Sequence, residues 1–560
     1  FDAGSRAPIA ISIMVKNPEV KEQGRILFHD IGDYLTREQK LKRIEALASV
    51  NGLMDAGLWQ NITPDEHGDW LRQRDDNFGK FIAIGSKDKY SGPVLFDLFS
   101  RGVETARDAW CFNSSKTGLE TNIKAMITTY EQERKRFNDA FPTLDRKERE
   151  TKLDGFVTSD PTRISWSRSL RQDFIKNVPL SFNNKKIVLS LYRPFQKQYL
   201  YFDKNINNYV NQVPRIFPDT NADNLTICVP GLGGDKGFSA FATNYAIDLN
   251  LAPAMGGYQA FPQFVYGEQD RTGQLYSPDN RSTREKSCNL HIRSGGGPTI
   301  LDDDDVLQSR PSSFARRSMF SDVSLRNGGQ PMTTSQGSLF EQTPSQPRLV
   351  RREAITDEGL KHFQDAYPGQ VITKQDLFYY VYGILHSPEY RERYADTLRK
   401  ELPRIPRVKT YEAFKAFSDA GRRLGEMHVN FDSQPIHEGV KVDYGKGPLT
   451  PEAFRVEKMK YGKGKDKSVL HYNDRITVTG IPLEAYDYVV NGKSALDWVI
   501  ERQCVKIDKA SGIINDANNW AIETMDNPRY PLELFLRVIT ISLETMKIVN
   551  GLPALDILES

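Results

Sequence analysis

The sequence SFNNKKIVLSLYRPFQKQYLYFDKNINNYVNQVPRIF, residues 181–217, combines strand-like patterning with a strong local positive charge. Its only acidic residue is Asp203, and its cationic residues are Lys185, Lys186, Arg193, Lys197, Lys204 and Arg215. Cationic side chains neutralise phosphates, and Arg, Gln and Asn can form paired hydrogen bonds to base edges. The aromatic residues of the stretch can stack on bases or fill a core. Two interpretations therefore stay open, a nucleic-acid surface or a β-sheet with a basic outer face and an aromatic inner face.

Length and charge limit what the whole chain can be. A chain of 560 residues is long enough for about three to five domains. Its 75 basic and 73 acidic residues nearly cancel, so a basic binding surface has to be local. The four cysteines form no CxxC pair, which argues against a zinc site or a disulfide scaffold and favours a reducing, cytoplasmic location. No apolar run approaches the roughly 18 residues that span a bilayer, so we expect no membrane partner.

The first 50 residues predict the end of an α/β domain. Alternating apolar residues predict one strand over residues 9–15 and the start of a second at Ile26. Thr36 and Gln39 match the capping box that begins a helix. The chain begins with Phe rather than Met and shows no signal peptide, so we expect a chain cut from its N-terminal side.

Residues 99–113, FSRGVETARDAWCFN, hold two further arginines of interest. Arg101 and Arg107 could contact phosphates or bases. Each could equally pair with a nearby acid, Glu104 or Asp108, and both interpretations stay open. A capping-box pattern at Thr117 then predicts a long helix, and short strands are predicted at 187–192, 199–202 and 225–229.

Two glycine-rich segments and one low-complexity tract interrupt these elements. Segments 231–237 and 462–468 fail the GxxxxGK[ST] pattern of a phosphate-binding loop, so we interpret them as turns between strands. Residues 267–352 are rich in Ser, Arg, Gly, Gln, Asp and Pro, which predicts a disordered insertion. Within this tract Gln336–Phe340, QGSLF, resembles the short peptide by which bacterial DNA-processing proteins dock on the sliding clamp, a pattern that also arises by chance.

Residues 353–560 predict a helical part with a β-hairpin. Helices are predicted to begin at the capping residues Thr373, Ser387, Thr410 and Ser494, and a last long helix is predicted over 531–549. The hairpin is predicted over 453–480. His386 and His428 are interpreted as structural, since no second ligand stands at metal spacing.

Several segments together resemble one family, the Type ISP restriction–modification enzymes. They are RILFHDIGDYLTREQKL (25–41), ITPDEHGDWLRQRDDNF (62–78), FSRGVETARDAWCFN (99–113), SLYRPFQKQYLYFD (190–203), YYVYGILHSPEYRERYADTLRKELPRIP (379–406), NGKSALDWVI (491–500) and ITISLETMKIV (539–549). Such enzymes join a nuclease, a helicase-like translocase, a coupler, an adenine-N6 DNA methyltransferase and a C-terminal target recognition domain in one polypeptide. The resemblance is to the C-terminal part and covers almost the whole chain outside 267–352.

The resemblance implies a mixed α/β (α+β) fold in four parts. Residues 1–50 would be the tail of a Rossmann-like methyltransferase fold. Residues 51–266 would be a mixed α/β target recognition domain, 267–352 a disordered insertion, and 353–560 the helical, hairpin-containing end of that domain. Its partners would be duplex DNA and the methyltransferase and helicase domains of the same polypeptide.

The catalytic motifs of the family are absent from this sequence. The N-P-P-Y motif, which holds a flipped adenine, is missing. Asn527–Tyr530, NPRY, has Arg at its third position and lies too near the C-terminus to replace it. The chain is therefore expected to bind no cofactor and no metal. S-adenosylmethionine, ATP and magnesium are implied by the resemblance for the full-length enzyme, a methyltransferase and ATP-dependent endonuclease of phage defence.

The sequence thus predicts sequence-specific recognition of duplex DNA without catalysis. The predicted DNA-binding residues are Arg193, Gln196, Lys197, Asn208, Gln212 and Arg215, followed by Arg101, Arg107 and Lys236. Two alternatives stay open: methyltransferase activity on the chain itself, or a stand-alone DNA-binding or protein-interaction scaffold that acts through 267–352.

Overall fold

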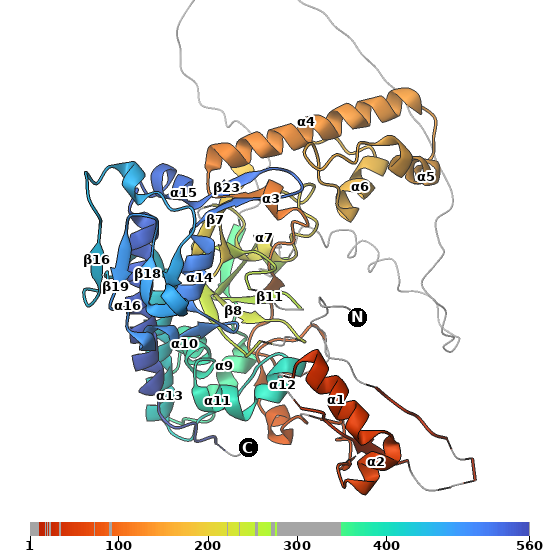
Figure 1. Ribbon diagram of the computed structural model, residues 1–560, viewed down its shortest axis with the longest axis vertical. Helices are drawn as coiled ribbons and strands as arrows, with labels where there is room; N and C mark the ends of the chain where they lie inside the picture. The colour runs from red at the N-terminus through yellow and green to blue at the C-terminus, as the bar shows by residue number, and fades with distance from the viewer. Residues whose placement is uncertain are drawn as a thin grey trace, which may run out of the picture. The chain divides into compact units, whose positions relative to one another are not determined.

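The computed structural model describes residues 11–16, 18, 19, 21, 24–32, 35–71, 73–88, 92–220, 222–233, 236–252, 256–269, 275, 276 and 349–558. The chain divides into two compact units, Phe1–Val265 with Glu353–Ser560, and Tyr266–Arg352. The larger unit is mixed α/β, as predicted, with several small sheets and a long C-terminal helix (Figure 1). The smaller unit contains β13 (Leu275–Tyr276) and most of β12 (Phe264–Gln269) and β14 (Leu349–Glu353), which form a three-stranded sheet. The QGSLF peptide lies outside the described residues.

The N-terminal segment leaves its apolar side chains uncovered. β1 (Ile26–Phe28) pairs antiparallel with β2 (Gln60–Ile62). In the sequence, α1 (Arg37–Leu47) and α2 (Val50–Asp55) connect these two strands. The predicted capping box at Thr36 and Gln39 is confirmed. The first predicted strand is wrong over 11–16, because these residues have no neighbouring strand to pair with. On α1, Leu41 and Ile44 are 55% and 47% exposed.

Two four-stranded sheets form the middle of the larger unit. One has the order β10-β6-β7-β5, from Ala246–Ile247, Ile187–Arg193, Gln196–Tyr201 and Phe112–Asn113. The other has the order β4-β11-β8-β9, from Ser100–Arg101, Tyr258–Pro262, Thr226–Pro230 and Phe241–Thr243. The three strands predicted from 187 to 229 are thereby confirmed.

The hairpin of β6 and β7 turns through Pro194 and Phe195. Phe195 has a positive φ of 58°, which with the preceding proline matches a type II turn. A non-glycine residue is uncommon in this conformation. The Phe195 ring compensates because it is fully buried against Phe241, Phe431 and Tyr488. The turn therefore ties the basic stretch to the C-terminal half of the chain.

A helical layer with its own core follows β5. It consists of α4 (Lys116–Ala140), α5 (Arg146–Phe156) and α6 (Arg168–Ile175), and the short α3 (Asp108–Cys111) precedes it (Figure 1). The long helix is confirmed, but its predicted start is wrong. Ser115, not Thr117, caps α4, because the Ser115 hydroxyl accepts the Gly118 amide at 2.9 Å. Asn113 in turn accepts the amide of Ser115 at 2.9 Å, which fixes the entry to the helix.

The C-terminal half is mainly helical. Its longer elements are α9 (Asp357–Gln364), α10 (Lys374–Ile384), α11 (Pro388–Arg393), α12 (Ala395–Lys400), α13 (Tyr411–Val429), α14 (Ala495–Arg502), α15 (Ala517–Glu523) and α16 (Tyr530–Asn550). The capping residues Thr373, Ser387, Thr410 and Ser494 are confirmed.

Short strands complete this half. β15 (Arg404–Ile405) pairs with β3 (Ile82–Ala83), and a four-stranded sheet has the order β16-β19-β18-β17, from Lys441–Asp443, Thr477–Thr479, Asp466–His471 and Lys460–Gly462. β20 (Val489–Val490) pairs with β21 (Lys493–Ser494), and β22 (Val505–Ile507) pairs with β23 (Ile514–Asp516). Segment 462–468 is the predicted turn, between β17 and β18.

His428 is a core residue, as predicted. Its ring is fully buried, and its two nitrogens lie 2.7 Å from the Tyr382 hydroxyl and 2.9 Å from the Thr545 hydroxyl. Burial lowers the pKa of His428 to about 3, so the ring is neutral in the core at neutral pH. It connects α13 to α10 and α16.

Helices α10 and α13 contact each other through their backbones. A Cβ on Gly421 would lie 1.9 Å from the Tyr379 carbonyl oxygen, and one on Gly383 would lie 2.1 Å from the Phe417 carbonyl oxygen. Both distances are far below van der Waals contact, so only glycine permits this approach.

We predict that Gly421→Ala destabilises the protein by about 1–3 kcal/mol or more, because the helices must separate. Gly425→Ala is the matched control on the same helix, since its Cβ would lie at an ordinary 3.4 Å from the Tyr379 ring. The control should be neutral or up to about 1 kcal/mol more stable, from helix propensity. Thermal unfolding of both variants checks this, and equal midpoints would contradict the close packing.

Candidate nucleic-acid interface

Two segments more than a hundred residues apart in the sequence lie side by side at β4. The Glu104 and Tyr209 amides each donate to the other residue's carbonyl, at 2.9 and 3.0 Å. The Asn211 side chain donates to the Gly102 carbonyl at 2.8 Å, and the Gln212 amide donates to the Ser100 hydroxyl at 3.0 Å. The backbone therefore aligns residues 100–104 with 209–212.

This alignment brings predicted residues from both segments together. Gln212 is exposed and Arg101 is half-buried, while Tyr209, which pairs with Glu104, is 52% exposed. Arg215 follows in α7 (Val213–Ile216), which begins directly after Gln212. We call the set Arg101, Tyr209, Gln212 and Arg215 the Tyr209 surface. Its residues carry an exposed aromatic ring, an exposed amide and two half-buried guanidinium groups, the chemistry that stacks on bases, bonds base edges and neutralises phosphates.

Arg193 lies inside the protein. Its guanidinium is 2.6 Å from Asp248 and 3.4 Å from Asp108, and it stacks on the Tyr192 ring at 3.8 Å. Burial alone would lower the pKa of Arg193, but the charges of Asp248 and Asp108 outweigh it and raise the pKa. Arg193 is therefore a buried cation that ties β6 to the segment around α3 and to residue 248.

Gln196, Lys197 and Asn208 are also engaged within the chain. The Gln196 amide donates to the Arg502 carbonyl at 3.2 Å. The Lys197 amino group is 2.8 Å from Asp432, and the Asn208 amide donates to Glu104 at 2.7 Å. These contacts join β7 to the C-terminal half and fix the loop that carries Tyr209. Whether the three residues also touch DNA stays a prediction.

Arg107 is buried, at 4% exposure, and its three guanidinium nitrogens have no hydrogen-bond partner among the described residues. Burial lowers its pKa, which the neighbouring Cys111 opposes. Neither Arg101 nor Arg107 forms an ion pair with Glu104 or Asp108 within the described residues. Asp108 instead contacts Thr105, Tyr192 and Arg193.

Lys236 lies in the glycine-rich segment after β8 and is exposed. Its side chain packs near Gly492, since a Cβ there would lie 3.1 Å from the Lys236 Cδ. Residues 234 and 235 of this segment are outside the described residues. The rejected NPRY segment leads into α16, whose first residue is the buried Tyr530, and its Asn527 side chain donates to Glu533 at 3.0 Å.

Within the described ranges, no group of three or more His, Cys, Asp or Glu residues is arranged to hold a metal ion. Cys111, Cys228 and Cys504 are buried free thiols, and Cys288 lies outside these ranges. No helix of the described chain has the length and apolarity to cross a membrane.

Sequence reasoning missed Tyr209. It was one aromatic residue among several in the basic stretch, and the others are fully buried, as Phe195 and Tyr201 are, or partly buried. The available signal was its surroundings, because Asn207, Asn208, Asn211 and Gln212 break the apolar alternation of a strand.

Comparison with known proteins gives the class of this protein. A family model, the Type ISP C-terminal specificity domain, matches residues 94–534. The chain is thus a specificity domain, and it belongs to the Type ISP C-terminal specificity domain family. No curated protein matches the sequence.

Three solved structures are similar over nearly all of the chain. A nuclease-deletion mutant of the Type ISP enzyme LlaGI, in complex with a DNA substrate mimic, has a TM-score of 0.72 and 31% identity over 96% of this chain. The ATP-dependent Type ISP enzyme LlaBIII bound to DNA has a TM-score of 0.73 and 30% identity over 97%. A DrdV–DNA complex has a TM-score of 0.65 and 25% identity over 95%. The chain spans only 40%, 28% and 43% of these proteins, respectively.

We predict that Arg193→Ala destabilises the protein by about 3–5 kcal/mol, because it leaves the Asp248 carboxylate, 1% exposed, without its cation. The double variant Arg193→Ala/Asp248→Asn should recover part of this loss. Arg399→Ala is the control, since Arg399 and Asp396 form a surface pair, 36% and 40% exposed, worth less than about 1 kcal/mol. Thermal unfolding is the measurement, and no difference between Arg193→Ala and the control would refute the buried-pair assignment.

Proposed function

We propose that this chain recognises a specific sequence in duplex DNA as the target recognition part of a Type ISP restriction–modification enzyme. The observation that carries the proposal is the family match over 94–534. The likeness to LlaGI, LlaBIII and DrdV, each in a complex with DNA or a DNA mimic, supports it. In such an enzyme, recognition would select the site that is methylated and the unmodified site that triggers ATP-driven translocation and cleavage.

The Tyr209 surface is the part of the chain that we propose reads the target. Arg101 and Gln212 have the side chains that bond guanine and adenine edges in the major groove, and the Tyr209 ring offers a face for stacking or packing. The backbone beneath them is fixed by the pairing of residues 100–104 with 209–212, so the side chains start from defined positions. This backbone would be held in place by the internal contacts of Arg193, Gln196, Lys197 and Asn208.

The other functions of the parent enzyme would lie outside this chain. We propose that residues 1–50 end an adenine-N6 methyltransferase domain, and the exposed apolar side chains of Leu41 and Ile44 support a further packing partner for α1. S-adenosylmethionine, ATP and magnesium would be bound by the methyltransferase and helicase-like parts, in the cytoplasm, in defence against phage.

Selection of the purified chain against random duplexes, at two salt concentrations, tests the proposal. An enriched, asymmetric motif of several base pairs would support a self-sufficient recognition domain, and the salt slope would give the number of phosphate contacts. Strongly salt-dependent binding without enrichment would mean that readout needs the methyltransferase part. Absence of binding at both salt concentrations would refute DNA recognition by this chain.

We predict that Gln212→Ala weakens binding to the selected motif by about 1–3 kcal/mol, or roughly 5–150-fold, and relaxes preference at one base pair. Binding to random DNA should change little, since no phosphate contact is removed. Gln370→Ala, at an exposed glutamine elsewhere, is the matched control. The assignment fails if Gln212→Ala and the control bind the motif with equal affinity.

A further inference from the structure

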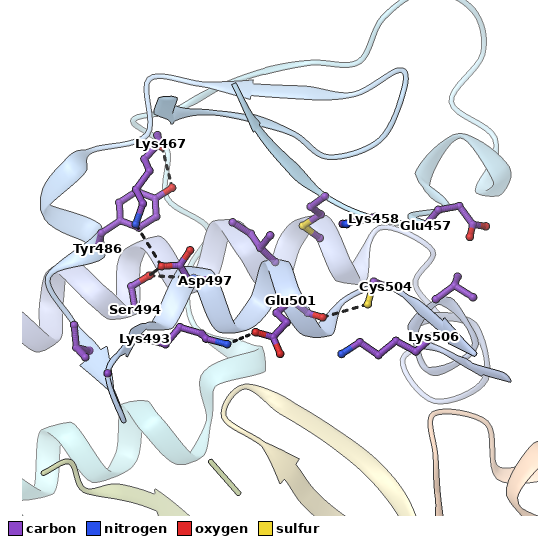
Figure 2. Close-up of a pocket in the computed structure, with 15 residues that line it drawn as sticks. Glu457, Lys458, Lys467, Tyr486, Lys493, Ser494, Asp497, Glu501, Cys504 and Lys506 are labelled. Atoms are coloured by element: carbon purple, nitrogen blue, oxygen red, sulfur yellow. Dashed lines mark hydrogen bonds and ion pairs between the residues drawn. The ribbon is translucent and has the colours of Figure 1, made fainter. Parts of the chain in front are cut away.

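A hollow of about 780 Å³ opens beside α14 in the larger unit, away from the residues of the Tyr209 surface. Its lining comes from residues 457–459, from the segment that carries β20 and β21, from α14 and from the start of β22. Figure 2 shows these side chains gathered along α14. The wall is partly apolar, from Met459, Val489, Ile500 and Val505.

The two carboxylates on α14 are already neutralised. Asp497 accepts the Ser494 and Tyr461 hydroxyls at 2.7 and 2.6 Å and lies 3.4 Å from Lys467. Glu501 pairs with Lys493, and with Arg502 at 2.7 Å. Burial alone would raise the pKa of Glu501, but the hydrogen bond from Lys493 and the charge of Arg502 lower it. Glu501 also acts electrostatically on Lys506. Glu457, the third carboxylate of the hollow, pairs with Arg455 at 3.0 Å.

Two further lysines of the hollow lie beyond ion-pair distance of the described carboxylates. Lys458 and Lys506 form no ion pair with a described residue, and both act electrostatically on Cys504. In Figure 2 their amino groups approach Cys504 from opposite sides. Burial lowers the pKa of Lys506, and the like charge of Arg502 lowers it further. The lining thus holds four lysines, Lys458, Lys467, Lys493 and Lys506, against the three carboxylates Glu457, Asp497 and Glu501, which leaves one positive charge in excess.

We propose that this hollow binds a phosphate group between Lys458 and Lys506. Lysine ammonium groups are compact point charges with rotatable donors, which suits phosphate oxygens. A bare ion would leave the apolar wall in water, whereas a sugar or base attached to the phosphate would cover it. The phosphate could belong to the DNA backbone or to a free nucleotide, and the chemistry of the site is the same for both. The site does not depend on the proposed readout by the Tyr209 surface.

The test uses the full chain and the double variant Lys458→Ala/Lys506→Ala. The control is Lys460→Ala/Lys463→Ala, which removes two exposed lysines of the neighbouring strand and turn outside the hollow. A third variant, Lys458→Arg/Lys506→Arg, keeps both charges. Calorimetry measures the binding of inorganic pyrophosphate and of adenosine diphosphate, and random-sequence duplex binding is titrated over a range of salt.

The double alanine variant should lose affinity for pyrophosphate by about tenfold or more, with the control unchanged and the arginine variant largely retained. If the natural source is the DNA backbone, its salt slope for duplex binding also falls by about two. If the source is a free nucleotide, adenosine diphosphate binding is lost while the salt slope stays the same. The proposal is overturned if neither phosphate binding nor the salt slope differs between the double alanine variant and the control.

Discussion

The buried contact of Arg193 with Asp248 is the interaction on which the candidate interface depends. Asp248 lies where three segments meet, since its amide donates to the Leu191 carbonyl of β6 and its backbone bridges to Val103. Arg193 closes the same junction from the end of β6 and also reaches Asp108. A carboxylate so far from water is tolerated only with its cation beside it. This ion pair therefore helps to hold residues 100–108 and the Tyr209 surface, together with the pairing of residues 100–104 with 209–212.

Behind this junction, the C-terminal half supplies a rigid support. The hairpin turn at Phe195 inserts its ring between Phe241, Phe431 and Tyr488, so strands β6 and β7 cannot shift without opening that cluster. The cluster itself rests on α10 and α13, whose backbones touch at Gly383 and Gly421. Close-packed interiors transmit such constraints because they have little free volume. The Tyr209 surface is thus carried by a closely packed frame, the arrangement that a precise binding site requires.

The near-zero net charge of the chain is explained by where the acids lie. Many cations, such as Arg193 and Lys197, are held against a carboxylate, and they contribute little field outside the protein. A positively charged surface arises instead where a cationic side chain has no carboxylate partner. Arg101, Lys458 and Lys506 have no ion-pair partner within the described residues, and they belong to the two regions that we propose contact a ligand.

The sequence by itself determined the element types, most helix starts and the family. Capping residues such as Thr373 and Thr410, and the short β-branched and apolar runs of β6 and β8, act over a few residues, so they can be read locally. Only the tertiary structure decided which basic residues face solvent. From the sequence alone, Arg193 and Gln212 are equally plausible DNA ligands. In the structure Arg193 pairs with Asp248, 55 residues away, whereas Gln212 is exposed. Burial and ion pairing depend on contacts between segments that are distant in the sequence, and local composition does not predict such contacts.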